Sequence, residues 1–413
     1  MVQPFWRGDI RLLFQTAMGV FVITVGIGML NGQHFIKLSQ DILLTHVHAG
    51  TIGWITLSVM ALCLWLFGGD DTPESHRTQD TMRAYIHALS VLAAVSVPVY
   101  VVAFFSGNLV ARAIFGFPVL AAIVGILVWI IQRSRQIRLT VAHIAILGAL
   151  VTVTVGAVIG VLLQVEFATS GNFLPSGAFA AHPATMVVGY LLLVGMAISE
   201  WRLMPDTGRL PRAGLVQIAL PFTAGLVLTV GLLYNNFALL GVNVLFEIVG
   251  VVIYIVRFAP RVLRARWLEP TSERYFAISS IFVVVNVALI VYLIGAIVTK
   301  VYTDFLLIPR WLVFGQDHAM FIGVMTNALF GLIYEVTRER RDYWRWADHI
   351  LFWGMNFGMI GFVLSLLANV PFFERVFTPI MGGSILLGLL TYTLRMRATS
   401  SSPAVVVAPA AVE

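Results

Sequence analysis

Residues 140–165 read TVAHIAILGALVTVTVGAVIGVLLQV, a run of 26 residues without a Lys, Arg, Asp or Glu. A helix of about 20 residues spans the roughly 30 Å hydrocarbon core of a bilayer. Comparable runs recur along the 413-residue chain, which is 59% hydrophobic and only 11% charged. Because soluble proteins carry about 25% charged residues, the sequence predicts an all-α membrane protein.

The apolar runs predict about twelve transmembrane helices within residues 1–398, the first of which is not a cleaved signal peptide. The tail at 399–413, TSSSPAVVVAPAAVE, is expected to be disordered and cytoplasmic. Cys63 is the one cysteine, which excludes a disulfide framework and a cysteine metal cluster. The helices are expected near 11–31, 42–68, 83–106, 110–132, 140–165, 177–203, 213–234, 237–258, 275–299, 311–336, 346–369 and 373–395.

Lys and Arg are distributed unevenly between the two ends of these helices. The termini and the loops after even-numbered helices carry 21 of the 26. This asymmetry predicts a bacterial inner-membrane protein with both termini in the cytoplasm. It also explains the net charge of +6, so we expect the bilayer and not nucleic acid as partner. The five on the other face are Lys37, Arg112, Lys300, Arg310 and Arg375.

Four histidines lie inside the predicted helices, where ionisable groups are costly. The three helices that carry them run in one direction, so the imidazoles are expected at one depth, in the outer third of the membrane. This pattern predicts a metal or haem site; packing histidines are the alternative interpretation. They lie near the start of the second, sixth and tenth predicted helices: His46, His48, His182 and His318.

The histidines also mark a repeat. Intervals of 134 and 136 residues separate His48, His182 and His318. A glycine follows five or seven positions later in THVHAGTIGWITL, FAAHPATMVVGYLLL and QDHAMFIGVMTNALFGL. We therefore predict three four-helix units around a pseudo-threefold axis. The glycines are Gly53, Gly189 and Gly323, and the units span about 11–132, 140–258 and 275–395.

His46 and His48 are two residues apart, so they point about 200° apart around a helix. They are expected to serve two sites on opposite sides of the second helix. Ala49, Gly50 and Gly53 would let a flat macrocycle approach the backbone. Helix–helix contact through small residues is the other explanation for them.

Other polar groups have several interpretations. Glu247 lies near the membrane centre, where it is either part of a proton path or protonated and hydrogen-bonded, with Asn243 as a possible partner. Asp317 adjoins His318 but points elsewhere on the helix, so we expect it to serve another group. Arg310, like Lys300, would pair with haem propionates or anchor the surface.

The remaining histidines predict no site. Those near the arginine-rich face are expected to pack or to contact lipid headgroups, and two fall in loops. They are His87, His143 and His349, and then His34 and His76.

These features resemble the catalytic subunit of the haem–copper oxidase superfamily, above all C-type oxidases and bacterial nitric oxide reductases. That family has twelve helices in three repeats of four. THVHAGTIGW is similar to its His-x-His helix, in which the first His holds the high-spin haem and the second the low-spin haem. His182, followed by Pro183, looks like its copper-ligand histidine.

Two departures from the family stand out. The family has His-x-His in helix 10 and one His in helix 2, whereas here helix 2 carries the pair. Helix 7, VQIALPFTAGLVLTVGLLY, has no histidine, although the family has a His-His pair there that completes a copper or non-haem iron site. Shorter NnrS-like relatives are another affiliation, although their His-Glu-Met signature is not evident.

The resemblance implies a haem-binding membrane redox protein that handles nitric oxide or oxygen, and an oxidoreductase if it is an enzyme. His48 and His318 would be axial ligands of a low-spin, b-type haem. His46 would bind a second haem or a copper ion with His182. A cytochrome or quinol would donate electrons. The alternatives are a proton-coupled transporter, and a non-catalytic haem-containing sensor or assembly partner.

Overall fold

A computed structural model describes residues 4–302 and 307–398. Within these ranges, twelve helical segments of 22 to 29 residues are long and apolar enough to cross a membrane. Their ends fall within a few residues of the predicted ones, and the all-α multi-pass membrane fold is confirmed. The predicted tail at 399–413 lies outside the described residues.

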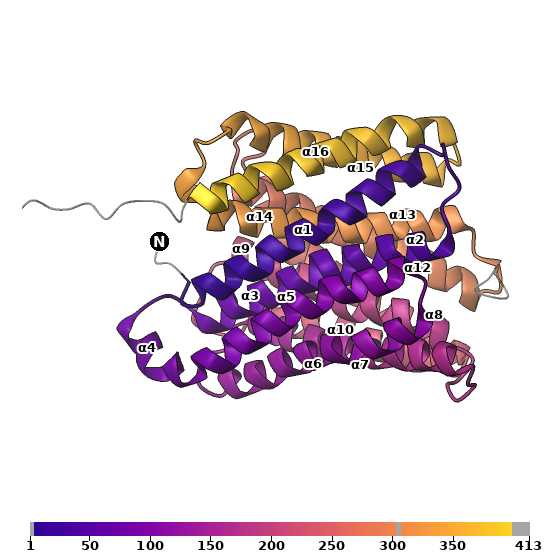
Figure 1. The fold of residues 1–413 in the computed structure, drawn as a ribbon, viewed down its shortest axis with the longest axis horizontal. Coiled ribbons are helices and arrows are strands. Elements are labelled where there is room, and N and C mark those ends of the chain that lie inside the picture. The colour runs from indigo at the N-terminus through magenta and orange to yellow at the C-terminus, as the bar shows by residue number, and fades with distance from the viewer. Residues whose placement is uncertain (1–3, 303–306, 399–413) are drawn as a thin grey trace, which may run out of the picture.

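Nine of the spans are single helices. The described N-terminal and C-terminal ends lie at the same end of the bundle (Figure 1). The nine are α1 (Arg7–Gly32), α5 (Arg83–Phe105), α6 (Leu109–Ser134), α7 (Val141–Thr169), α10 (Arg212–Leu233), α11 (Phe237–Leu263), α12 (Ser272–Val298), α15 (Arg345–Leu367) and α16 (Pro371–Ala398).

The second, sixth and tenth spans each contain a π-helical segment between two α-helical ones. A π turn holds an extra residue, is uncommon, and is frequent at functional sites. Its presence at the same depth in three helices reflects their common place in the repeat. The segments are α2 (Gln40–His48), η1 (Ala49–Thr56) and α3 (Leu57–Gly68); α8 (Ala178–Ala184), η3 (Thr185–Leu191) and α9 (Leu192–Leu203); α13 (Arg310–His318), η5 (Ala319–Thr326) and α14 (Asn327–Val336).

The predicted glycine repeat coincides with these segments. Gly53, Gly189 and Gly323 are each the fifth residue of a π-helix. At each position a Cβ would collide with the first helix of the same unit, so the glycines serve helix–helix contact. The side chains met are those of Val20, Thr152 and Phe282, in that order.

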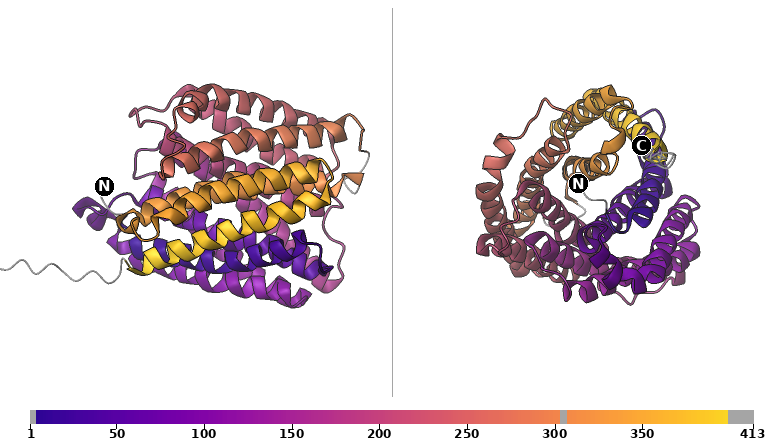
Figure 2. Two further views of the ribbon diagram at one scale, coloured as in Figure 1. Left: turned by 90° about the horizontal axis from the view of Figure 1, so that it is seen from above. Right: turned by 90° about the vertical axis from the view of Figure 1, so that its left-hand side faces the viewer.

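The twelve spans form three units, 7–134, 141–263 and 272–398, that close into a ring. The last helix of each unit packs on the first of the next: α6 on α7, α11 on α12, and α16 on α1. Seen end-on, the indigo N-terminal helices lie beside the yellow C-terminal ones (Figure 2). We call the three contacts the first interface (units one and two), the second (two and three) and the third (three and one).

Side chains near the axis repeat as well. Trp54, the sixth residue of η1, donates its indole N–H to Thr326 Oγ1 at 3.0 Å. Tyr190, the sixth of η3, donates to Thr56 Oγ1 at 3.4 Å. In η5 the same position is Val324, which packs against Gly195. Two polar contacts and one apolar contact thus join the units at the centre.

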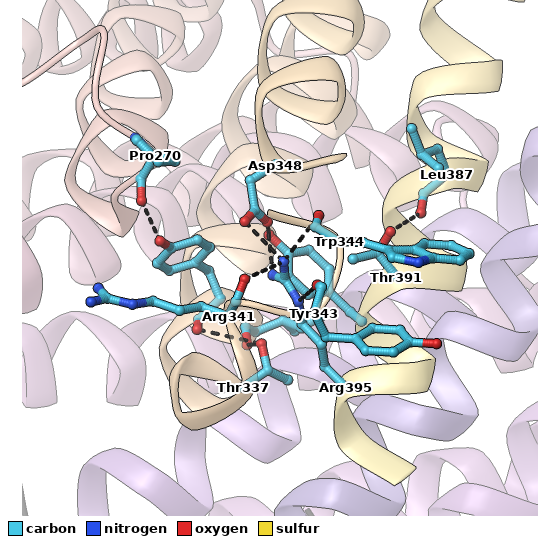
Figure 3. Close-up of polar contacts among 12 residues, drawn as sticks. Pro270, Thr337, Arg341, Tyr343, Trp344, Asp348, Leu387, Thr391 and Arg395 are labelled. Carbon is cyan, nitrogen blue, oxygen red and sulfur yellow. Dashed lines mark hydrogen bonds and ion pairs between the residues drawn. The ribbon is translucent and has the colours of Figure 1, made fainter. Parts of the chain in front are cut away.

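A buried ion pair fixes the last two helices at the arginine-rich end. Arg395 meets the Asp348 carboxylate with Nη1 at 2.8 Å and Nη2 at 3.0 Å, and both side chains are almost fully buried. Its Nε donates to the Tyr343 carbonyl at 2.9 Å. Figure 3 shows the guanidinium enclosed by these groups. The pair thereby joins α15 and α16 to the loop before them.

Candidate functional site

The four membrane histidines lie directly before the π-helical segments. In Figure 1, α2, α8 and α13 lie at the end of the bundle opposite the chain termini. His48 and His318 immediately precede η1 and η5, whereas His46 and His182 stand three residues before η1 and η3. His46 therefore corresponds to His182, and His48 to His318. The interval of 134 residues that matched His48 with His182 is two residues shorter than the 136 that separate Gly53 from Gly189, so this match from the sequence spacing was wrong by two residues.

The corresponding residues His46 and His182 bond to the first helix of their own unit. The Nδ1 atom of His46 donates to the Thr24 carbonyl at 2.8 Å, and that of His182 to the Gly156 carbonyl at 2.8 Å. A carbonyl can only accept, so Nδ1 carries the hydrogen. Each ring therefore presents the lone pair of Nε2, the form that binds a metal.

His48 and His318 have the same tautomer as His46 and His182, but their Nδ1 atoms donate to carbonyls of their own helices. His48 Nδ1 donates to the Leu44 carbonyl at 2.8 Å and His318 Nδ1 to the Phe314 carbonyl at 2.7 Å. Both acceptors lie one turn earlier. All four imidazoles thus have the same tautomer, with Nε2 directed away from the backbone.

Two glycines, one on α1 and one on α7, leave space for the rings of His46 and His182. A Cβ on Gly28 would lie 2.9 Å from His46 Cε1, and a Cβ on Gly160 would lie 2.6 Å from His182 Cε1. Nothing in the sequence analysis singled these glycines out. Their spacing of 132 residues, close to the repeat length, was the available signal.

His46 and His318 form the first pair, at the third interface. Their ring centroids are 6.5 Å apart and their planes differ by 25°. Two imidazoles on opposite sides of one metal ion, with bonds of about 2 Å, have centroids roughly 6 to 6.5 Å apart. His46 and His318 are therefore far enough apart that both could hold one metal ion between them. The structure thus places His46, and not His48, opposite His318, because His48 faces the other side of α2, as the angle between it and His46 predicts.

His48 and His182 form the second pair, at the first interface. Both line a mainly apolar cavity of about 450 Å³. The His48 ring stacks on Phe104 with centroids 3.7 Å apart. Ligand pockets of proteins have volumes of about 300 to 1,000 Å³, so the cavity has the size and lining of a site for an apolar ligand.

Arg112 provides the positive charge of this cavity. Its side chain is buried, and its Nη2 contacts Asp41 Oδ1 at 2.5 Å and the Phe104 carbonyl at 2.9 Å. Its Nε atom has no partner among the described residues. The sequence placed Arg112 only among the five cations of the face opposite the termini; in the structure it lies within α6. Arg310, the expected partner of an anionic group, is exposed and does not line the cavity.

Asp317 also lines the cavity of the second pair. It therefore faces away from the pair formed by its neighbour His318, as expected for adjacent residues on a helix. The tenth span, like the second, presents polar groups to two interfaces.

The second interface lacks both imidazoles. Gln316 lies three residues before η5, where His46 and His182 stand in their units, and Ala184 lies immediately before η3, where His48 and His318 stand. Gly28 and Gly160 each lie eight residues after the residue that meets the repeated glycine of their unit, Val20 or Thr152. In the third unit that residue is Phe282, and the position eight residues later is Ile290. Two of the three interfaces are thus equipped with histidine pairs.

Glu247 is not part of either pair. It is buried at the second interface, and neither carboxylate oxygen has a partner among the described residues. Asn243, its expected partner, donates instead to the Ala224 carbonyl at 3.1 Å. The small residues Gly50 and Gly53 pack against α1, which favours helix contact over macrocycle access.

The other histidines have local contacts. His143 bonds to Thr140 at the start of α7 and to the Leu66 carbonyl. His87 pairs with Asp9. These contacts agree with packing and surface roles.

Across the described ranges, no three metal-binding side chains converge. Paired imidazoles suit a metal that brings its other ligands with it, as the iron of a tetrapyrrole does. No known family model matches the chain, and no curated protein is similar to it in sequence.

Proposed function

We propose that the chain is a haem-binding redox protein of the membrane, with one haem between His46 and His318 and a second between His48 and His182. The main support for this proposal is the 6.5 Å separation of the His46 and His318 ring centroids. When bound, the haem iron would supply one-electron chemistry. The protein's part would be to present Nε2 of each imidazole to the iron.

The tautomers support this proposal. Carbonyl acceptors at Nδ1 fix the orientation of each ring and raise its basicity as a ligand. Copper alone has less support, because no third metal-binding side chain joins either histidine pair within the described residues. For the second haem, the Arg112 guanidinium at the cavity would pair with a propionate.

Gas chemistry at the second site is the next candidate. Bis-His ligation favours electron transfer, whereas an open position favours binding of a diatomic gas. The cavity of about 450 Å³ beside His48 supports nitric oxide or oxygen as the ligand there. A cytochrome or quinol is the proposed donor, and the arginine-rich face is proposed to be cytoplasmic.

Absorption spectroscopy of the purified protein, oxidised and reduced, tests the proposal. We expect sharp reduced α-bands from a low-spin haem. A shift of the reduced spectrum with carbon monoxide would support gas binding, and an unchanged spectrum would leave electron transfer alone. A protein that stays colourless after expression with ample haem would refute haem binding and favour transport.

A further inference from the structure

We propose that the second interface contains a hydrated proton path that leads from the arginine-rich face to Glu247 and ends there. This inference goes beyond haem binding and does not depend on it. It rests on a line of buried polar side chains in the one interface that has no histidine pair, as far as the chain is described.

Glu247 is the inner end of the path. Only 1% of its surface is exposed, and both carboxylate oxygens lack a protein partner within the described residues. An ionised carboxylate without a partner is very costly in a low-dielectric interior. The group is therefore a neutral acid at rest, and its hydrogen-bonding groups are available to water.

Glu247 lies on the one polar stripe of α11. The buried positions of this helix recur every three or four residues and include Asn243, Glu247 and Tyr254. This face packs against α10 and α12, while Val252 and Val256 are exposed on the opposite side. The stripe thus faces α10 of its own unit and α12 of the next unit, and not the lipid.

Two serines continue the stripe toward the arginine-rich face. The Tyr254 hydroxyl is buried without a hydrogen-bond partner among the described residues but lies near Ser199 and Ser280. The two serine hydroxyls are 3.0 Å apart. All three side chains are buried. Hydroxyl groups both donate and accept, so this cluster can pass a proton between water molecules.

A charged cluster forms the entrance. Arg257 contacts Glu200 Oε1 at 2.7 Å and Gln217 Oε1 at 2.6 Å. The second oxygen of Glu200 and the Nε2 atom of Gln217 are buried without partners in the described part of the chain. Unpaired buried polar atoms of this kind are normally satisfied by ordered water.

Water must bridge the gaps along the path. Glu247 and Arg257 are ten residues apart, about 15 Å along the helix. Pro221 of α10, against which Gly250 packs, donates no hydrogen bond to the Gln217 carbonyl one turn before it. That carbonyl therefore lacks its usual helical donor and can accept a bond from water.

The path is closed on the other side. One turn beyond Asn243 the stripe continues with Leu240, which is apolar and 2% exposed. A proton that reaches Glu247 therefore returns the way it came or passes to a group at the membrane centre. In the transfer the carboxyl O–H bond breaks, the proton joins a neighbouring water molecule, and the carboxylate keeps the electron pair.

Infrared spectroscopy of the full-length protein in H₂O and D₂O tests the path. The wild-type minus Glu247→Gln difference is expected to contain one C=O stretch of a protonated carboxylic acid, which moves to lower frequency in D₂O. Tyr254→Phe and Ser280→Ala should slow this exchange several-fold. Ser279→Ala is the matched control, because Ser279 bonds to the Val324 carbonyl instead.

Three results would overturn the proposal: no such band in the difference, a band that does not respond to D₂O, or equal exchange rates in Tyr254→Phe, Ser280→Ala and Ser279→Ala. If Glu247→Gln does not fold, Glu247→Asp replaces it, and the band should then move in frequency. The measurement needs no bound haem. The proton path can therefore be confirmed even if the haem proposal fails, and it can be refuted even if haem binds.

Discussion

The imidazoles of His46 and His318 face each other across the third interface, with centroids 6.5 Å apart and planes 25° from parallel. The two residues are 272 positions apart in the chain and meet because α16 packs back on α1 to close the ring. His48, only two residues from His46, faces a different interface and a different partner. One helix thus contributes to two sites.

If a haem lies between His46 and His318 as proposed, His46→Ala and His318→Ala should each abolish its low-spin band, because each removes one of the two histidines proposed to hold it. His48→Ala should leave that band in place. His87→Ala is the control, since His87 is exposed and pairs with Asp9. Absorption and paramagnetic resonance spectra provide the measurement. A band lost in His48→Ala and His318→Ala but kept in His46→Ala would restore the pairing expected from the sequence.

Gly28→Val should disturb only the haem at the third interface, and Gly160→Val only that at the first. In each variant the new side chain would occupy the space of a histidine ring, His46 or His182. Gly26→Val is the control, because nothing lies within 4 Å of a Cβ there. Haem content per protein and the reduced spectrum report the effect. Equal losses in all three variants would point to general misfolding.

Arg112→Met should weaken haem retention at the first interface by about tenfold to a hundredfold, because a hydrogen bond to a charged group contributes about 1.5–3 kcal/mol. The third interface should be unaffected. Arg310→Met, at an exposed position, should change neither site. Haem titration of the apoprotein measures both. If Arg310→Met weakened haem retention more than Arg112→Met does, the assignment of Arg112 would be contradicted.

Arg395→Met should destabilise the fold by about 3–5 kcal/mol, because it leaves the Asp348 carboxylate buried without its partner. Asp348→Leu with Arg395→Met should recover part of this loss. The exposed pair Arg138–Asp206 offers a comparison, since Asp206→Asn should cost at most about 1 kcal/mol. Unfolding in detergent with increasing denaturant gives the values. If Arg395→Met alone loses less stability than Asp206→Asn, the buried ion pair contributes little to the fold.

The sequence by itself determined the number, length and positions of the membrane spans. In lipid every backbone polar group must be satisfied within its own helix, so hydropathy along the chain decides each span separately. The common direction of the three helices predicted the depth of the four histidines. The sequences that flank these histidines predicted the glycine repeat. The angle between His46 and His48 also followed from helix geometry alone.

Only the tertiary structure decided which histidines face each other. The pairing depends on how each helix is rotated against its neighbours, and the π turns after His48 and His318 change that rotation by one residue. Arg112 likewise became part of a cavity only when α6 packed beside α2 and α8. Spans are local properties, whereas sites between units exist only once the ring has closed.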